Sequence, residues 1–204
     1  YTCLTDKSRI QYLRNTAKKN GAKLEYIISS SWNGYKDKIE AMREAIKRLK
    51  DNEIVCFVDA YDVLINGSTD EIKNRFLNEE CDVIFGAEMC CYPEKHLLRH
   101  DEYNRNRLKK TNHVYLNAGG YIGYVYAIKR ILYWKSDDEI YKSCSDGTDQ
   151  AYMMEYIFEH EVEVKLDTEA NIFLNMHKVD WSEIEVRNGK IRNKVLKNEP
   201  CIVH

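Results

Sequence analysis

The chain has 204 residues, and 31 Lys and Arg residues against 33 Asp and Glu residues give a formal net charge of -2. This length suits one globular domain, and a charged fraction of 31% leaves no apolar run of the roughly 20 residues that a membrane span needs. Because a broad contact with phosphates requires an excess of Lys and Arg, the balanced charge also argues against a protein that coats nucleic acid.

Strands and helices are predicted to alternate in the first part of the chain, where apolar residues recur at helical spacing between short extended runs. The predicted elements are a strand at residues 1–5, a helix at 7–20 that Gly21 ends, a strand at 23–29, a helix at 35–50 and a strand at 54–58. Such alternation predicts a parallel sheet, and the wholly apolar run 54–58 is typical of a central strand with helices on both faces.

The middle of the chain continues this alternation and then loses it. Ser68, with Glu71 three residues later, marks the start of a helix that runs to Leu77, and a buried strand is predicted at 82–87. Residues 89–112 are polar, charged and aperiodic, so we expect a surface loop there. Its basic residues fit either a solvated loop or a patch that binds an acceptor, and its histidines lack the spacing of a metal site.

The last part combines helices with short strands. The predicted elements are helices at 125–135 and 149–158, a hairpin of strands 183–186 and 190–194 around Asn188-Gly189, and a strand at 201–203. We therefore expect one α/β domain over residues 1–204, in which ligands bind at the carboxyl ends of the strands.

Seven cysteines are present, and no two of them form a C-x-x-C pair. A zinc site is therefore not expected, and buried reduced thiols are the favoured interpretation.

Two carboxylates, Asp59 and Asp62, follow the buried strand 54–58 directly. Such a pair can hold a hard divalent cation, which would neutralise the phosphates of a nucleoside diphosphate, although acidic residues also occur in ordinary turns. A phosphatase-type aspartyl nucleophile is disfavoured, because that pattern requires carboxylates two residues apart and these are three apart.

Two further segments have residues suited to a ligand site. Gly119 and Gly120, within residues 116–123, allow either a close approach of backbone to a ligand or a bend in a strand. Asp146, Asp149 and Gln150 lie at the start of a predicted helix, where they could also serve as caps.

The segments FVDAYDVL, VIFGAEMCCYP, YLNAGGYIGY, SDGTDQ, LDTEANIFLNM and IVH occur together and in this order. The ordered set, which spans nearly the whole chain, resembles the glycosyltransferase domain of the procollagen lysyl hydroxylase family. The resemblance implies a GT-A fold, with a Rossmann-like, mainly parallel sheet flanked by helices and mixed C-terminal strands. It also implies Mn2+ as cofactor, UDP-glucose as donor, and collagen or a collagen-like polypeptide as acceptor.

The resemblance assigns roles to residues of this sequence that match the family's motifs. It implies Asp59, Asp62 and His204 as metal ligands, a set that suits Mn2+ better than Mg2+. The residues implied in donor binding are Thr5, Asp6, Lys38, Tyr61, Asn117, Gly119 and Gly120, with Tyr61 against the uridine and Lys38 near the phosphates. Those implied in catalysis are Asp149, Asp146 and Gln150, with Asp149 the principal candidate.

The resulting prediction is an enzyme that transfers glucose from UDP-glucose to galactosyl-hydroxylysine. Galactosyl transfer from UDP-galactose to hydroxylysine, and a non-catalytic module that binds UDP or collagen, are the alternatives. A homodimer is left open. The abundance of Lys, Asn, Ile and Tyr suits an AT-rich genome such as that of a giant DNA virus. Location follows from origin: the endoplasmic reticulum lumen by resemblance to animal members, or the host cytoplasm or virion for a viral protein.

Overall fold

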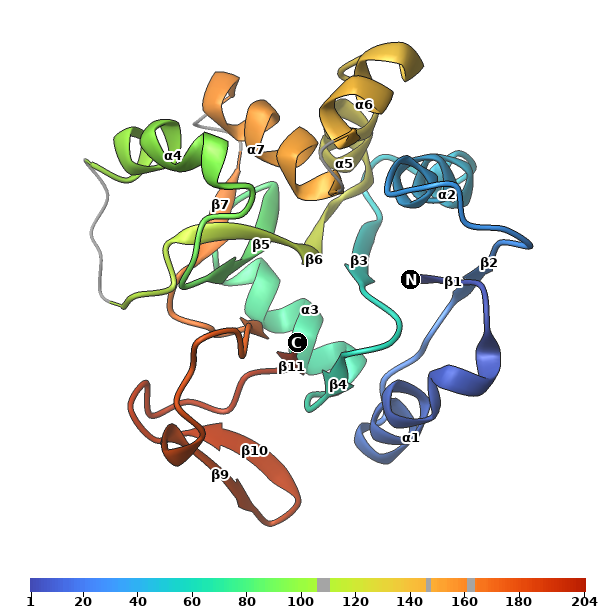
Figure 1. The fold of residues 1–204 in the computed structure, drawn as a ribbon. Helices are drawn as coiled ribbons and strands as arrows, with labels where there is room; N and C mark the ends of the chain where they lie inside the picture. Colours follow the sequence, from blue (N-terminus) through green and yellow to red (C-terminus); the bar gives the residue numbers. More distant parts are fainter. Residues whose placement is uncertain (106–110, 146–147, 161–163) are drawn as a thin grey trace.

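The computed structural model describes residues 1–105, 111–145, 148–160 and 164–204. A central sheet runs through this part of the chain (Figure 1), with strands in the order β3-β6-β5-β8-β11-β4 and β7 beside β5. Its strands are β3 (Ile54–Val58), β4 (Leu64–Ile65), β5 (Val83–Glu88), β6 (Tyr115–Tyr124), β7 (Lys165–Asp167), β8 (Phe173–Leu174) and β11 (Ile202–Val203).

Most strands of this sheet run in one direction. β7 and β8 are parallel to β5, β11 is parallel to β8, and β3 shares their direction because both β3 and β5 are antiparallel to β6. Only β6 and β4 are reversed. The mainly parallel α/β sheet with mixed strands is confirmed. For β6, the sequence offered only a possible bend in a strand at Gly119 and Gly120, and its reversed direction was not predicted, since the residues of a strand do not reveal which way it runs.

A second strand pair continues the sheet beyond β3. β1 (Thr2–Leu4) pairs in parallel with β2 (Tyr26–Ile28). The backbone nitrogen of Tyr1 donates to the Cys56 carbonyl at 2.7 Å, and the Val58 N–H donates to the Tyr1 carbonyl at 3.0 Å. β3 therefore lies between β1 and β6, as expected of a central strand.

Helices cover both faces of the sheet. They are α1 (Gln11–Asn20), α2 (Lys36–Ile46), α3 (Thr69–Leu77), α4 (Leu97–Asn104), α5 (Val125–Leu132), α6 (Asp137–Cys144) and α7 (Asp149–Glu159). In β5, Val83 and Phe85 face the core shared with α2, α5, α6 and α7, whereas Ile84 faces the core shared with α1 and α3. This period of two follows from the pleat of the strand, so one apolar run supplies two cores.

The remaining elements are short. They are three 3-10 turns, η1 (Lys7–Arg9), η2 (Glu94–His96) and η3 (Trp181–Glu183), and the hairpin of β9 (Ile184–Arg187) and β10 (Lys190–Asn193). The hairpin lies where Asn188-Gly189 predicted it, and both turn residues have positive φ.

The prediction of a surface loop at 89–112 was wrong for the described part of that segment. It forms η2 and α4, and His100 and Asn104 are buried. His100 Nε2 accepts the Leu116 N–H at 3.0 Å, and Asn104 Nδ2 donates to the Val114 carbonyl at 2.9 Å. Two of the three buried residues of this helix are thus polar and bond to backbone in or next to β6, which removes the apolar period that would have revealed the helix.

The helix α6 was also missed by sequence reasoning, although its start has a recognisable signal. Ser136 and Glu139 form a reciprocal capping box. Throughout the described ranges, no helix is both long and apolar enough to cross a bilayer. All seven cysteines are free thiols, of which Cys91, Cys144 and Cys201 are buried.

Candidate active site

The first acid of the candidate site, Asp59, is positioned where β3 meets β6. Its N–H donates to the Gly119 carbonyl at 2.8 Å. The register between β5 and β6 shifts here, so that Phe85 lies opposite Tyr121 but Gly86 lies opposite Asn117. The extra residues of β6 bulge away from β5, which brings Asn117 and Gly119 to the end of β3.

Three potential metal ligands converge at this point. One atom each of Asp59, Asp62 and His204 lies within 4.8 Å of the others. His204 Nε2 is 3.5 Å from Asp62 Oδ2 and 3.9 Å from Asp59 Oδ2. The three residues follow β3 and β11, strands that share one direction, so their carboxyl ends meet at one edge of the sheet.

The orientation of His204 suits a metal ligand. Its Nδ1 lies 2.9 Å from Asn175 Oδ1 and 3.2 Å from Asn117 Oδ1, two acceptors that assign the proton to Nδ1 and leave Nε2 facing the carboxylates. Burial lowers the pKa of His204, but the hydrogen bond that its ring donates to Asp62 and the charge of Asp59 outweigh this effect, so the pKa is raised. Two carboxylates and one imidazole form a donor set that fits Mn2+.

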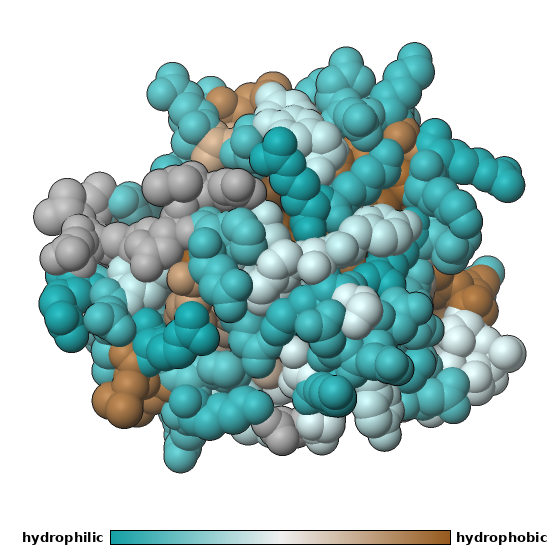
Figure 2. Space-filling model, turned by 90° about the horizontal axis from the view of Figure 1, so that it is seen from above, coloured by the Kyte–Doolittle hydropathy of each residue, from teal (hydrophilic) through white to brown (hydrophobic). Residues whose placement is uncertain are grey.

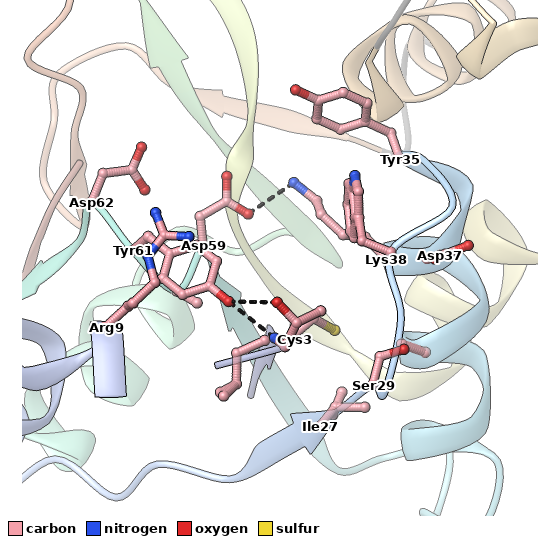
Figure 3. A pocket seen from close by; sticks show the side chains of 15 residues that line it. Cys3, Arg9, Ile27, Ser29, Tyr35, Asp37, Lys38, Asp59, Tyr61 and Asp62 are labelled. Atoms are coloured by element: carbon pink, nitrogen blue, oxygen red, sulfur yellow. Dashed lines mark hydrogen bonds and ion pairs between the residues drawn. The ribbon is translucent and has the colours of Figure 1, made fainter. Parts of the chain in front are cut away.

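Lys38 joins this group to the candidate catalytic acid. From α2 its Nζ reaches Asp59 Oδ1 at 2.8 Å (Figure 3) and Asp149 Oδ2 at 3.1 Å. Burial lowers the pKa of Lys38, yet the charges of Asp149 and Asp59 prevail and raise it, so the ammonium stays charged. Burial raises the pKa of Asp149, and the Lys38 charge opposes that effect.

A cavity of about 440 Å³ opens beside Lys38 and the two acids. It extends from Asp59 and Asp62 past Tyr61 to Thr5, and Figure 3 shows these side chains around one space. The Tyr61 hydroxyl accepts N–H groups of Thr5 at 3.0 Å and Asp6 at 3.2 Å, which fixes the ring while 39% of the residue stays exposed.

Of the predicted donor-binding residues, Thr5, Lys38 and Tyr61 line the cavity, whereas Asp6, Asn117, Gly119 and Gly120 do not. The Asp6 side chain points to its own turn, where its Oδ1 accepts the Ser8 N–H at 2.8 Å and caps η1. The Asp6 carboxylate therefore stabilises the local turn, and the contact of Asp6 with Tyr61 is made by its backbone N–H.

The space beside the paired glycines of β6 is filled by protein side chains and is not open. A Cβ atom on Gly119 would lie 2.1 Å from Cε1 of His204, and one on Gly120 would lie 2.7 Å from the Phe173 ring. Asn117 Oδ1 accepts the Gly119 N–H at 2.9 Å. The close approach at these glycines is made by protein side chains rather than by a ligand, and at Gly119 it seats His204.

Asp149 begins α7 and is buried, and Thr148, rather than an acid, caps the helix by accepting the Gln150 N–H. Gln150 uses its side chain fully: Oε1 accepts the Ala118 N–H at 2.9 Å, and Nε2 donates to Glu88 at 2.9 Å and to the Tyr92 carbonyl at 2.7 Å. These bonds make Gln150 a positioning residue. Asp146 lies outside the described residues.

Two buried residues of the site were missed by sequence reasoning. Glu88 Oε1 accepts from Asn117 Nδ2 and Gln150 Nε2, and Asn175 bonds His204 while its Nδ2 donates to the Ala87 carbonyl. The signal was present, since both are polar residues that end or follow a buried strand, as Asp59 does.

Comparisons with known proteins agree with the resemblance of the motifs. The model of the PLOD GT domain family matches residues 11–204. The chain is 30% identical over 183 residues to a procollagen-lysine,2-oxoglutarate 5-dioxygenase of Drosophila melanogaster, and 28% identical over 182 residues to the human multifunctional procollagen lysine hydroxylase and glycosyltransferase LH3. It is 27% identical over 199 residues to an uncharacterized protein of Acanthamoeba polyphaga mimivirus.

The alignments cover 82%, 82% and 89% of this chain, but only 23%, 22% and 40% of the three relatives, in the same order. The chain thus corresponds to less than half the length of each of these relatives. Since the family model covers nearly all of the chain and the sheet carries helices on both faces, the chain belongs to the PLOD GT domain family, a group of glycosyltransferase domains with the GT-A fold.

Proposed function

We propose that this domain transfers glucose from UDP-glucose to galactosyl-hydroxylysine in collagen or a collagen-like polypeptide, with Mn2+ at Asp59, Asp62 and His204. The observation that carries the proposal is the link through Lys38 between this ligand group and the buried Asp149, beside a cavity of about 440 Å³. The names of the relatives support the acceptor, because the human one is a procollagen lysine hydroxylase and glycosyltransferase.

Donor binding follows from the walls of the cavity. The half-exposed Tyr61 ring offers a face on which a uracil base can stack, and its hydroxyl is held by Thr5 and Asp6. Lys38 lies between this wall and Asp149 and presents a positive charge to the phosphates. The bound metal ion would supply charge neutralisation for the diphosphate leaving group.

Asp149 is the residue placed to stabilise the reacting sugar. As the bond to UDP breaks, positive charge develops on the sugar, and a buried carboxylate stabilises such charge more strongly than one in water. Gln150 holds the start of α7 against β6 through the Ala118 N–H, which keeps Asp149 in place. Asp149 therefore contributes to the rate rather than to the affinity for UDP.

The proposal is tested by separating binding from transfer. The double variant Asp59→Asn/Asp62→Asn should lose Mn2+-dependent UDP binding in calorimetry, whereas Asp149→Asn should bind UDP and lose transfer. Asp51→Asn, at a 71% exposed carboxylate paired with Lys129, is the matched control and should change neither. Mn2+-dependent UDP binding that survives the double substitution would remove these acids from the site.

A further inference from the structure

A second cavity lies beside the candidate active site and shares no lining residue with the donor cavity. Its volume is about 740 Å³. Its walls come from the residues that follow β5, those that precede β6 and those on either side of the β9–β10 hairpin, and they include Cys90, His113, Tyr115, Lys178, Glu183 and Leu196. We call this cavity the lateral groove.

The wall of the lateral groove is connected directly to the candidate active site. His113 Nε2 lies 3.3 Å from the Asn175 carbonyl, and Asn175 Oδ1 lies 2.9 Å from Nδ1 of the metal ligand His204. On the other side, Met89 lines the groove and follows Glu88, which accepts from Asn117 and Gln150. The groove wall is therefore connected, through Asn175 and through Glu88, to the residues that position His204 and Gln150.

The lining of the groove suits a polypeptide better than a small ligand. Lys178 and Glu183 present opposite charges, and Lys178 is held in the left-handed region with φ of 66°. Val195 in the lining is 64% exposed, and Tyr115 adds an aromatic ring to the same lining. Aromatic and apolar side chains of this kind dock extended, proline-rich segments, whose backbone is already ordered before binding.

A partner that docks on a broad apolar surface has less support than a polypeptide bound in the lateral groove. The face seen in Figure 2, from above the view of Figure 1, is mainly hydrophilic, with hydrophobic residues in small, separate groups, so that face offers no broad apolar docking surface. The groove instead combines charges of both signs with apolar side chains, and an extended chain that carries side chains of both kinds would complement it.

We propose that the lateral groove binds the extended polypeptide that flanks the modified lysine of the acceptor, while the lysine itself enters the active site. This assignment rests on the proposed function, because it concerns the acceptor of that reaction. It predicts that the domain distinguishes a peptide acceptor from the free amino acid through residues outside the donor cavity.

The test compares two acceptors, free galactosyl-hydroxylysine and a collagen-like peptide that carries the same residue at its centre. The variants Lys178→Glu and Val195→Asp, at two lining residues, should raise KM for the peptide about tenfold, as is typical when an anchoring side chain of an interface is lost. They should leave kcat, KM for free galactosyl-hydroxylysine and UDP release without acceptor unchanged. Lys47→Glu, at an exposed lysine paired with Glu44, is the matched control.

Equal KM values for the peptide in wild type and both variants would overturn the assignment. A parallel rise of KM for both acceptors would also overturn it, since that result would place these residues at the reacting sugar. If the domain turns over no UDP-glucose, the proposed function fails, and fluorescence anisotropy of the labelled peptide still tests the groove. Weaker binding by Lys178→Glu than by wild type supports it, and equal binding assigns the groove to another occupant.

Discussion

Lys38 is the residue on which the site depends most, because it is the only described cation within ion-pair distance of Asp59 or Asp149 apart from His204. Two carboxylates that are both close to one buried ammonium repel each other once it is gone. The proposed metal ligand Asp59 and the proposed catalytic acid Asp149 are thus linked through one side chain that contacts both.

Replacing Lys38 with Met should lower the free energy of unfolding by about 3 kcal/mol at pH 7, since it leaves buried carboxylates without their partner. Lys47→Met, at the exposed end of the same helix, should change it by less than about 0.5 kcal/mol. Urea unfolding followed by circular dichroism measures both values. An equal effect of the two substitutions would show that Lys38 is not a structural counter-ion.

Gly119 controls the position of His204. Its φ is not in the left-handed region, so Gly119→Ala introduces no backbone strain, but the new Cβ would overlap the His204 ring at 2.1 Å. The ring must then move from Asn117 and Asn175. We expect a variant that folds and binds Mn2+ about tenfold or more weakly, by analogy with the loss of groups that orient a ligand. Calorimetric titration with Mn2+ measures this, and unchanged affinity would refute the seating role of Gly119.

At the level of single residues, the sequence predicted the acids better than their partners. Asp59, Asp62 and Asp149 could be located because charged residues next to apolar runs stand out. Glu88 and Asn175 are more deeply buried than Asp59 and Asp62, yet a single polar residue at the end of a strand also fits an ordinary turn. Their role depends on the β-bulge at Asn117, which pairing creates and composition does not reveal.

Among the elements, α7 carries the catalytic candidate at its N-terminus. The Thr148 side chain accepts the Gln150 N–H at 3.0 Å, and Thr148 is buried, whereas the capping serine of α6, Ser136, lies at an exposed helix start. The cap of α7 therefore lies next to the buried Asp149, whereas the cap of α6 stabilises an exposed helix start.

Thr148→Ala and Ser136→Ala should each lower the free energy of unfolding by about 1 kcal/mol, the usual cost of losing an N-cap. Only Thr148→Ala should also reduce transfer, because it frees the turn that orients Asp149 and Gln150. Thermal unfolding and UDP release are the two measurements. Equal activity in the two variants would contradict a link between the α7 cap and catalysis.

The connection from β7 to β8 depends on Asp167, which accepts the N–H groups of Asn171, Ile172 and Phe173. Burial, which outweighs these hydrogen bonds, raises the pKa of Asp167 from 3.8 to about 6. The folded state then binds more protons than the unfolded state between these values, so the contribution of Asp167 to stability falls as pH rises from about 4 to about 6.

Asp167→Asn removes this titration. The difference in unfolding free energy, wild type minus variant, should therefore decrease by about 3 kcal/mol between pH 4 and pH 7, since each unit of pKa shift corresponds to about 1.4 kcal/mol. Urea unfolding at several pH values measures the difference. A difference that stays constant or grows with pH would show that the hydrogen bonds dominate over burial.

Element positions were mostly predictable, and the exceptions share one cause. The helices before residue 80 and the hairpin at Asn188-Gly189 follow local signals, namely apolar period, caps and turn residues. The helix α4 was not predicted, because its buried residues His100 and Asn104 are polar and form hydrogen bonds to backbone in or next to β6. Such bonds belong to the tertiary structure, so no local pattern predicts them.

For the whole molecule, the mainly parallel direction of the sheet was predictable from the alternation of strands and helices. The antiparallel insertion of β6 between β3 and β5 was not, since the order of strands depends on long-range pairing. That insertion matters for function, because it brings the bulge at Asn117 and Gly119 between the ends of β3 and β11, where His204 meets Asp59 and Asp62. The ordered motifs indicated the site before its geometry was visible.

The most direct test of the central claim is UDP release from UDP-glucose and from UDP-galactose in the presence of Mn2+, with and without a galactosyl-hydroxylysine peptide. We predict turnover of UDP-glucose that the peptide stimulates and that metal chelation abolishes. Turnover of UDP-galactose on a bare hydroxylysine peptide would instead identify a galactosyltransferase. Tight UDP binding without turnover of either sugar would contradict the account and leave a binding module.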